Sequence, residues 1–439
     1  MSDRVVLLSI PGLRKQDLPQ MPNLRALIAQ GDQATLVPSF PAVTCPVQVN
    51  MTTGTTPCEH GVIANGFYWR DKGEVEMWTA WNQVVERPQI WDTLKKHQPG
   101  RTAAVWFPLL AKGCGADYVC TPAPIHNPDG SESLWCYTKP TELYGELRDA
   151  LQDFPLKHFW GPLAGIPSTA WIVDSAIAAA QRWRPDVFYI YLPHLDYAAQ
   201  KLGPDSDAAR KAVGDLDAVL GKLVAGLTTA YGKPAPLWLV ASEYTIVPVD
   251  HVTYPNRVLR EAGLAAIETR ADGEHLDLAG SRAFAMVDHQ LSHVFVRDPG
   301  DIGRVVDLFR GREGIAEVLT GEGIARYELD HPRTGEVVLI SEPRSWQAYY
   351  WWLDDQRAPA FARTVDIHRK PGYDPVELHV DMATRSIPLD ATRVRGSHGA
   401  PAGDDSQRGI ILSSEPGVLY SGSLADTDVY GLVLRQFGI

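Results

Sequence analysis

The sequence predicts an α/β fold in which a mostly parallel β-sheet is sandwiched between helices. Short apolar segments rich in β-branched residues alternate with longer amphipathic segments, which is typical of parallel strands and their covering helices. The predicted strands are residues 5–10, 103–107, 187–192, 237–241 and 409–412. The predicted helices are residues 21–30, 169–182 and 207–231. In such a sheet, functional residues are expected in the loops at the carboxyl ends of the strands.

The composition is that of a large, acidic, globular protein. Its 439 residues are 45% hydrophobic and 21% charged, which is enough to bury a sizeable core. The formal net charge of -12 argues against nucleic acid as a partner, because phosphate binding needs clustered Lys and Arg. The apolar run at residues 5–10 is too short to span a bilayer, so we expect no membrane partner and a cytoplasmic location. The five cysteines contain no Cys-x-x-Cys pair, which predicts reduced thiols.

Two long stretches interrupt the alternation and are interpreted as insertions. The first covers residues 113–160, and the second covers residues 263–395 and contains a strand signal of its own at residues 283–297. We predict a core formed by residues 1–262 and 396–439. Residues 263–395 then form a smaller α+β cap, which we expect to shape the substrate pocket.

Two features of the predicted cap have structural interpretations. The aromatic run at residues 349–352 is interpreted as core packing inside the cap, because large aromatic side chains bury readily. The segment at residues 370–375, KPGYDP, has strong turn chemistry and is interpreted as a surface turn. Closure of this segment over the pocket is the alternative.

The strongest motifs lie near the N-terminus and at two later strand ends. Residues 40–48 read FPAVTCPVQ, residues 59–61 read EHG and residues 65–66 read NG. Later, residues 192–196 read LPHLD and residues 396–399 read GSHG. In order and spacing, these segments resemble the nucleotide pyrophosphatase/phosphodiesterase family of the alkaline phosphatase superfamily. The resemblance implies an alkaline-phosphatase-like core and an activity on phosphate esters.

The resemblance also implies roles for individual residues. Thr44 matches the nucleophile, which opens a helix in this family and so lies at the positive end of the helix dipole. Two divalent ions supply the deprotonated nucleophile, the neutralised phosphoryl group and the stabilised leaving oxygen that such chemistry requires. Asn65 matches a residue that hydrogen-bonds a phosphoryl oxygen. An ordinary Asn-Gly turn is an equally open interpretation of Asn65.

The chain departs from the family at the metal ligands. One metal is normally held by an Asp in the first loop and by an Asp-His pair, but Pro11, Glu243 and Tyr244 stand at these positions. The other metal normally takes an Asp, a His four residues later and a His near the C-terminus. Asp196 and His398 are kept, and Gln200 stands in place of the His that follows the Asp. Proline has no ligating side-chain atom, and a tyrosine or an amide is a weak ligand for zinc. A normal two-metal centre is therefore not expected.

The predicted site combines these residues with their polar neighbours. The candidate catalytic residues are Thr44, Glu243, Tyr244 and His398. The candidate substrate-binding residues are Asn65, His194, Tyr197 and Gln200. Asp196 and His398 are the candidate ligands of a single metal site, so the predicted cofactor is one divalent cation (zinc, manganese or magnesium) or none.

A further constellation, Asp288-His289-Gln290-Leu291-Ser292-His293, lies in the predicted cap. On a helix, the spacing of His289 and His293 would place both imidazoles on one face and suit a metal. The strand-like residues 294–296 that follow favour hydrogen-bonded histidines at the cap hinge instead.

Three functions remain open on this basis. The first is a phosphodiesterase- or phosphatase-like hydrolase or transferase that acts on a phosphorylated small molecule through Thr44. The second is a metal-independent enzyme of a biosynthetic pathway, such as a lyase, cyclase or isomerase, in which Glu243 or Asp196 is the base and Tyr244 or His398 the acid. The third is a non-catalytic ligand-binding pseudoenzyme.

Overall fold

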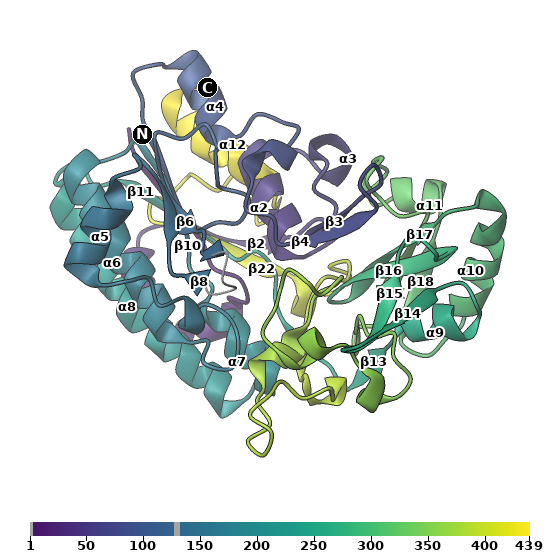
Figure 1. The fold of residues 1–439 in the computed structure, drawn as a ribbon. Helices are drawn as coiled ribbons and strands as arrows, with labels where there is room; N and C mark the ends of the chain where they lie inside the picture. The colour runs from purple at the N-terminus through teal and green to yellow at the C-terminus, as the bar shows by residue number, and fades with distance from the viewer. Residues whose placement is uncertain (1–2, 127–131) are drawn as a thin grey trace.

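The central feature of the fold is a mostly parallel sheet of nine strands (Figure 1). The structure, a computed structural model, describes residues 3–126 and 132–439. In spatial order the strands are β23 (Ser423–Ala425), β2 (Gln33–Val37), β22 (Gly409–Ser413), β11 (Leu237–Ala241), β1 (Val5–Ser9), β10 (Val187–Tyr191), β5 (Ala103–Trp106), β6 (Tyr118–Pro122) and β9 (Cys136–Lys139). All five predicted strands are present, and the predicted fold class is confirmed.

Most neighbouring strands of the sheet pair in parallel, whereas β22 and β9 run antiparallel to their neighbours. β1 pairs in parallel with both β10 and β11, and Leu7 faces Tyr189 on one side and Leu239 on the other. β22 runs antiparallel to β11 and β2. The interpretation of residues 113–160 as an insertion is wrong, because β6 and β9 from this stretch extend the main sheet. Their polar and Pro-rich surroundings hid the strand pattern.

Helices cover both faces of the sheet because its strands are apolar on both sides. Val6 and Leu8 of β1 pack into one apolar cluster, whereas Val5 and Leu7 pack into another on the opposite face. The helices of the first face are α1 (Pro22–Leu27), α5 (Leu143–Leu151), α6 (Ile166–Trp183) and α8 (Asp207–Tyr231). The helices of the second face are α2 (Thr44–Thr53), α4 (Ile90–His97) and α12 (Asp428–Leu434).

A second, smaller sheet lies within residues 263–395, beside the main one (Figure 1). Its strands, in spatial order, are β16 (Ala283–Asp288), β17 (Leu291–Val296), β19 (Val337–Ser341) and β18 (Ile315–Leu319). The helices around it are α9 (Pro255–Glu261), α10 (Ile302–Phe309) and α11 (Glu322–Ala325). The aromatic run at residues 349–352 is buried in the apolar cluster of this region, as expected. We keep the division into a core and a cap at residues 263–395 as a proposal.

The carboxyl ends of the central strands open into the segments that carry the predicted site. β10 leads into α7 (His194–Leu202), and β11 leads into residues 242–245. The loop after β2 leads into α2. Within the described residues, no helix has the length and apolar character needed to cross a bilayer.

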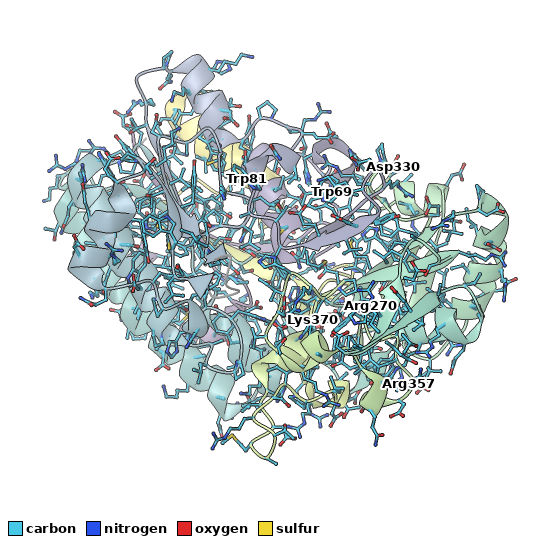
Figure 2. The ribbon with its side chains drawn as sticks, viewed as in Figure 1. Trp69, Trp81, Arg270, Asp330, Arg357 and Lys370 are labelled. Atoms are coloured by element: carbon cyan, nitrogen blue, oxygen red, sulfur yellow. The ribbon has the colours of Figure 1, made fainter. Side chains whose placement is uncertain are left out.

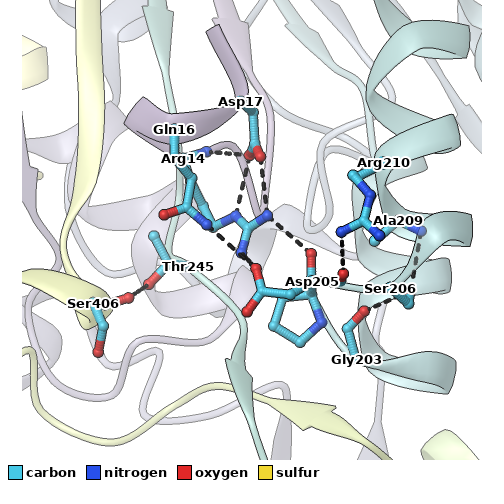
Figure 3. A network of polar contacts seen from close by, with 11 residues as sticks. Arg14, Gln16, Asp17, Gly203, Asp205, Ser206, Ala209, Arg210, Thr245 and Ser406 are labelled. Atoms are coloured by element: carbon cyan, nitrogen blue, oxygen red, sulfur yellow. Dashed lines mark hydrogen bonds and ion pairs between the residues drawn. The ribbon is translucent and has the colours of Figure 1, made fainter. Parts of the chain in front are cut away.

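An ion-pair network fixes the loop that follows β1. Arg14 pairs with Asp17 in the same loop and with Asp205 just before α8, and it also donates to the carbonyl of Pro204 (Figure 3). Nearby, Thr245 Oγ1 donates to the carbonyl of Ser406 at 2.6 Å and ties down the loop after β11. These contacts hold two of the loops that surround the site.

Candidate active site

Thr44 is the first residue of α2, and its hydroxyl meets that of Tyr244. Val43 is the N-cap, with extended backbone angles, so the helix and its dipole begin at Thr44. Thr44 Oγ1 lies 2.9 Å from Tyr244 OH, and either atom can be the donor. Thr44 is only 3% exposed. The structure therefore brings together two residues that are 200 positions apart in the sequence.

Tyr244 links Thr44 to Asp196 and His398, the two residues predicted as metal ligands. Its hydroxyl lies 3.5 Å from both carboxylate oxygens of Asp196, a long and weak contact. Its ring stacks on that of His398, with centroids 3.6 Å apart and planes 7° from parallel. Burial, with the nearby charge of Asp196, raises the pKa of Tyr244 well above its usual value, so the hydroxyl keeps its proton.

His398 is held as one defined tautomer. Its Nδ1 lies 2.8 Å from the carbonyl oxygen of Ala42, and because a carbonyl only accepts, Nδ1 carries the proton. Nε2 therefore bears a lone pair, and it has no hydrogen-bond partner among the residues that the structure describes. Burial lowers the pKa of His398 well below its usual value, and the neighbouring His289 adds to this. The imidazole is thus neutral and offers an acceptor atom inside the site.

Two buried carboxyl groups flank this arrangement. Glu243 Oε1 accepts from Ser9 Oγ at 2.5 Å and from Gln48 Nε2 at 2.8 Å, while burial raises the pKa of Glu243 to about 8. Burial likewise raises the pKa of Asp196 to about 7, although the nearby polar groups of Gln200 and Tyr244 oppose the shift. Near neutral pH, Glu243 is therefore protonated and Asp196 can either accept or release a proton.

The three candidate binding residues on α7 point to different neighbours. Gln200 Oε1 accepts from Tyr373 OH at 2.5 Å. The ring of Tyr197 packs beside Trp160, at a centroid distance of 6.4 Å. Burial lowers the pKa of His194 to about 4, and the charges that act on it belong to Asp215 and Lys211 of α8, so His194 faces that helix.

Asn65 joins the start of α2 to the cap. Its Oδ1 accepts the backbone N–H of Cys45 at 2.9 Å, and its own backbone N–H and Nδ2 donate to the two carboxylate oxygens of Asp288 at 2.8 and 3.0 Å. The side chain is therefore more than a turn former. It fixes the residue after Thr44 relative to the tip of the hairpin formed by β16 and β17.

That hairpin tip brings Asp288 and His289 into the site, where neither residue was predicted to have a role. Asp288 ends β16, and His289 Nδ1 lies 2.5 Å from Asp288 Oδ1. The His289 ring lies 3.9 Å from that of His398 and stacks on Tyr373 at 3.6 Å. The helical metal motif considered for residues 288–293 is wrong, because the segment is a β-hairpin and His293 faces the carbonyl of Ile63 at 3.1 Å. The Asp-His sequence was the available signal, but only the hairpin turn shows where it points.

A buried ion cluster anchors the cap loop that carries Tyr373. Lys370 Nζ lies 2.8 Å from Asp374 and 2.6 Å from Glu377, and Glu377 also accepts from Trp160 Nε1 at 2.5 Å. Figure 2 shows Lys370 between the part of the molecule that holds the main sheet and the part that holds the smaller sheet. The interpretation of residues 370–375 as a surface turn is wrong, because Lys370, Tyr373 and Asp374 are buried. The loop instead covers His289.

The fold defines an α/β protein with a large, mostly parallel central sheet between helices. The type I phosphodiesterase / nucleotide pyrophosphatase family matches residues 5–374, and the chain belongs to this family. The resemblance seen in the sequence is thereby confirmed. Members of the family are hydrolases of the phosphodiesterase and pyrophosphatase type that act on phosphorylated substrates.

Individual relatives are distant. An uncharacterised pyrophosphatase/phosphodiesterase of Schizosaccharomyces pombe is 24% identical over 234 residues, which cover 51% of this chain and 40% of that protein. The match thus spans less than half of that relative's length. Phosphonoacetate hydrolase of Sinorhizobium meliloti, solved with phosphonoformate, superposes with a TM-score of 0.63 at 16% identity and covers 99% of this chain and 95% of its own. Murine ectonucleotide pyrophosphatase/phosphodiesterase 5 gives a TM-score of 0.65 at 14% identity, with the same coverage of 99% and 95%. These likenesses show the fold.

Members of the family use divalent metal ions, but the donor atoms of this chain do not fit a metal pair. The oxygen of Gln200 that could ligate a cation already accepts from Tyr373. The ring of Tyr244 stacks on His398, where a histidine ligand would be expected. Among residues 3–126 and 132–439, no three His, Cys, Asp or Glu side chains come together in a way that could hold a cation.

Proposed function

We propose that this chain hydrolyses or transfers a phosphodiester of a small molecule, with Thr44 as the nucleophile and without a paired metal centre. The observation that carries the proposal is the buried 2.9 Å contact between Thr44 Oγ1 and Tyr244 OH at the N-terminus of α2. A hydroxyl nucleophile needs a proton acceptor, and Tyr244 connects Thr44 to the carboxyl group of Asp196.

The proton path runs from Thr44 through Tyr244 to Asp196. As the bond from Thr44 Oγ1 to phosphorus forms and the bond from phosphorus to the leaving oxygen breaks, the Thr44 proton passes to Tyr244 OH. The leaving group keeps the electron pair of the broken bond, departs as an anion such as nitrophenolate, and takes its proton from solvent. Tyr244 passes its own proton to the Asp196 carboxylate, so Tyr244 stays neutral. The pKa of Asp196, about 7, suits a group that accepts a proton near neutral pH. The 3.5 Å contact between Tyr244 and Asp196 has to shorten for this transfer.

The electrostatics of the site favour a diester over a monoester. Thr44 and Tyr244 contact Asp196 and the neutral His398. The side chains beside a bound phosphate are therefore either negatively charged or neutral. The dipole of α2 provides an attraction for an anion of up to about 2 kcal/mol, the value for favourable partly buried helix ends. A phosphomonoester carries about two negative charges and a diester one, so the diester is repelled less.

A nitrophenyl phosphodiester tests the proposal directly. We expect the chain to release nitrophenol from bis(p-nitrophenyl) phosphate, and to do so faster than from p-nitrophenyl phosphate, after removal of metals with a chelator. Thr44→Ala should reduce release to the uncatalysed background, and Thr44→Ser should retain part of it as the matched control. Cleavage that survives Thr44→Ala, or that occurs only when zinc is supplied, would contradict the proposal.

The same atoms favour a second candidate, a metal-independent lyase, cyclase or isomerase. His398 presents the lone pair of Nε2, whereas Tyr244 keeps its proton, so the two groups are matched as base and acid for a neutral substrate. In that case Thr44 only orients Tyr244. Thr44→Ala would then leave most of the activity on the natural substrate, whereas Tyr244→Phe would abolish it.

The partner proposed from these considerations is a small phosphorylated molecule. One neighbouring structure holds phosphonoacetate, and another, of an inactive variant of the murine protein, holds AMP. We also propose a cytoplasmic location. The five cysteines, all within the described residues, are free thiols, which is the usual state in a reducing compartment.

A further inference from the structure

We infer that the cap supplies a second catalytic pair, in which Asp288 orients His289 and His289 is the general base for the water that releases phosphate from Thr44. This inference rests on the proposed function, because it concerns the second step of the same reaction. It adds a catalytic role for residues of the cap, whereas the proposed first step uses residues of the core.

The hairpin turn holds the pair against the core. The backbone N–H of Gln290 donates to the carbonyl of His398 at 3.0 Å, and the carbonyl of His289 accepts from the N–H of Gln347 at 2.8 Å. His289 adopts a φ of 58°, a left-handed conformation that is unfavourable for a residue with a side chain. Such backbone strain concentrates at functional sites, because the surrounding structure must hold it in place.

Asp288 fixes the orientation of the imidazole. Both of its carboxylate oxygens already accept N–H groups of Asn65, so the carboxylate also meets His289 Nδ1 as an acceptor. Nδ1 therefore carries the ring proton, and the lone pair lies on Nε2, on the opposite edge of the ring. An Asp-His pair of this kind presents an oriented base, as in many hydrolytic sites.

Two chains of contacts connect the pair to the nucleophile. Through hydrogen bonds, Asp288 connects by Asn65 to the N–H of Cys45, the residue after Thr44. Through ring contacts, His289 meets His398 at 3.9 Å, and His398 meets Tyr244 at 3.6 Å. The ring of Tyr373 also stacks on the ring of His289, at a centroid distance of 3.6 Å. The faces of the imidazole are packed, which leaves its edges for proton transfer.

In the second step, water hydrolyses the Thr44 adduct. The oxygen of a water molecule forms a bond to the phosphorus of the Thr44 adduct while the bond from phosphorus to Thr44 Oγ1 breaks. The water proton passes to His289 Nε2. The Thr44 oxygen takes back the proton that Asp196 received in the first step, through Tyr244. Release of product and loss of the proton from His289 to solvent restore the starting state.

Trapping of the adduct tests the inference. We expect His289→Gln, given bis(p-nitrophenyl) phosphate, to release one nitrophenol per chain and then turn over about 10² to 10⁴ times more slowly than the unmodified protein. Intact mass should show one nitrophenyl phosphoryl group on the chain, located at Thr44 by peptide mapping. Asp288→Asn should accumulate the same adduct, which covers the case in which His289→Gln does not fold.

His293→Gln is the matched control, because His293 lies on β17 of the same hairpin and is equally buried. It should turn over without accumulating adduct. If neither His289→Gln nor Asp288→Asn accumulates adduct while the unmodified protein cleaves the diester and Thr44→Ala does not, the inference is wrong and the proposed function stands. If the unmodified protein does not cleave the diester, both are wrong.

Discussion

Tyr244 and His398 stack with their rings 3.6 Å apart and 7° from parallel, beside the hydroxyl of Thr44. His289 and Tyr373 continue the succession of rings from the core into the cap, at 3.9 Å and 3.6 Å. The first and last rings of this row both contact α7: Tyr244 contacts Asp196, and Tyr373 donates a hydrogen bond to Gln200. These packed rings tie the hairpin tip and residue 373 to the strand ends of the main sheet.

The hydroxyl of Tyr244 should matter for chemistry more than for folding. Tyr244→Phe keeps the ring and its stack on His398 but removes the contact with Thr44. We expect cleavage of the diester to fall by about 10² to 10⁴-fold, the usual contribution of a positioned proton-transfer group, while the melting temperature changes little. Steady-state kinetics and thermal unfolding of the same preparation check both parts. An unchanged kcat would remove Tyr244 from the proton path.

The rate should depend on pH through Asp196. The carboxylate form accepts the proton from Tyr244, so kcat/KM should rise with pH and level off above about 7, the raised pKa of Asp196. Asp196→Asn should eliminate both the activity and this limb of the profile. A profile that stays flat from pH 5 to pH 9 is the result that would exclude Asp196 as the acceptor.

Glu243 should make the fold less stable as the pH rises. Its pKa is raised from 4.5 to about 8 in the folded chain because burial penalises the charged form. Between these values the folded state therefore binds more protons than the unfolded state, so this contribution is complete below pH 4.5 and is lost as the pH rises through about 8. The free energy of unfolding should fall by up to about 1.4 kcal/mol per pH unit from this group.

Glu243→Gln provides the comparison for this effect. The amide keeps an oxygen for the hydrogen bonds from Ser9 and Gln48 but cannot ionise. Urea unfolding at several pH values between 5 and 8 should show a shallower decline for the variant than for the unmodified protein. Parallel declines would mean that Glu243 does not titrate in this range.

Lys370 should be important for stability because its charge is buried with two carboxylates. Lys370→Met leaves Asp374 and Glu377 without their cation and should destabilise the protein by about 3–5 kcal/mol. Arg270, labelled in Figure 2, forms an exposed pair with Glu268 and is the matched control. Arg270→Met should leave the free energy of unfolding nearly unchanged. Equal effects of the two changes would contradict this assignment.

Restoring one histidine should increase metal binding. Gln200→His would add an imidazole to Asp196 and His398, whose Nε2 already carries a lone pair, and so complete three ligands. The change also removes the hydrogen bond from Tyr373. We expect zinc, measured by competition with a chromogenic chelator, to bind at least tenfold more tightly to the variant. Equal affinities would show that Tyr244 blocks the position regardless of the ligands.

The sequence was sufficient to predict the α/β class, the central strands and the position of Thr44 at the start of a helix. These features are encoded locally, since runs of β-branched residues and helical periodicity occupy contiguous segments such as β1 and α8. The family motifs are likewise contiguous. The departures from the family pattern at Pro11, Gln200 and Tyr244 stay a prediction, made without coordinates because each is a change of side-chain type within a contiguous motif.

Only the tertiary structure decided what those side chains contact. The meeting of Thr44 with Tyr244, the entry of Asp288 from the cap and the hydrogen bond from Trp160 to Glu377 all join segments far apart in the chain. The sequence did not predict β6 and β9, which lie at one side of the sheet. They form strands because they pair with the sheet, and their local sequence pattern is weak. Local propensities determine which elements form, but the packing of one element against another determines which polar groups are buried together and hence which protons can move.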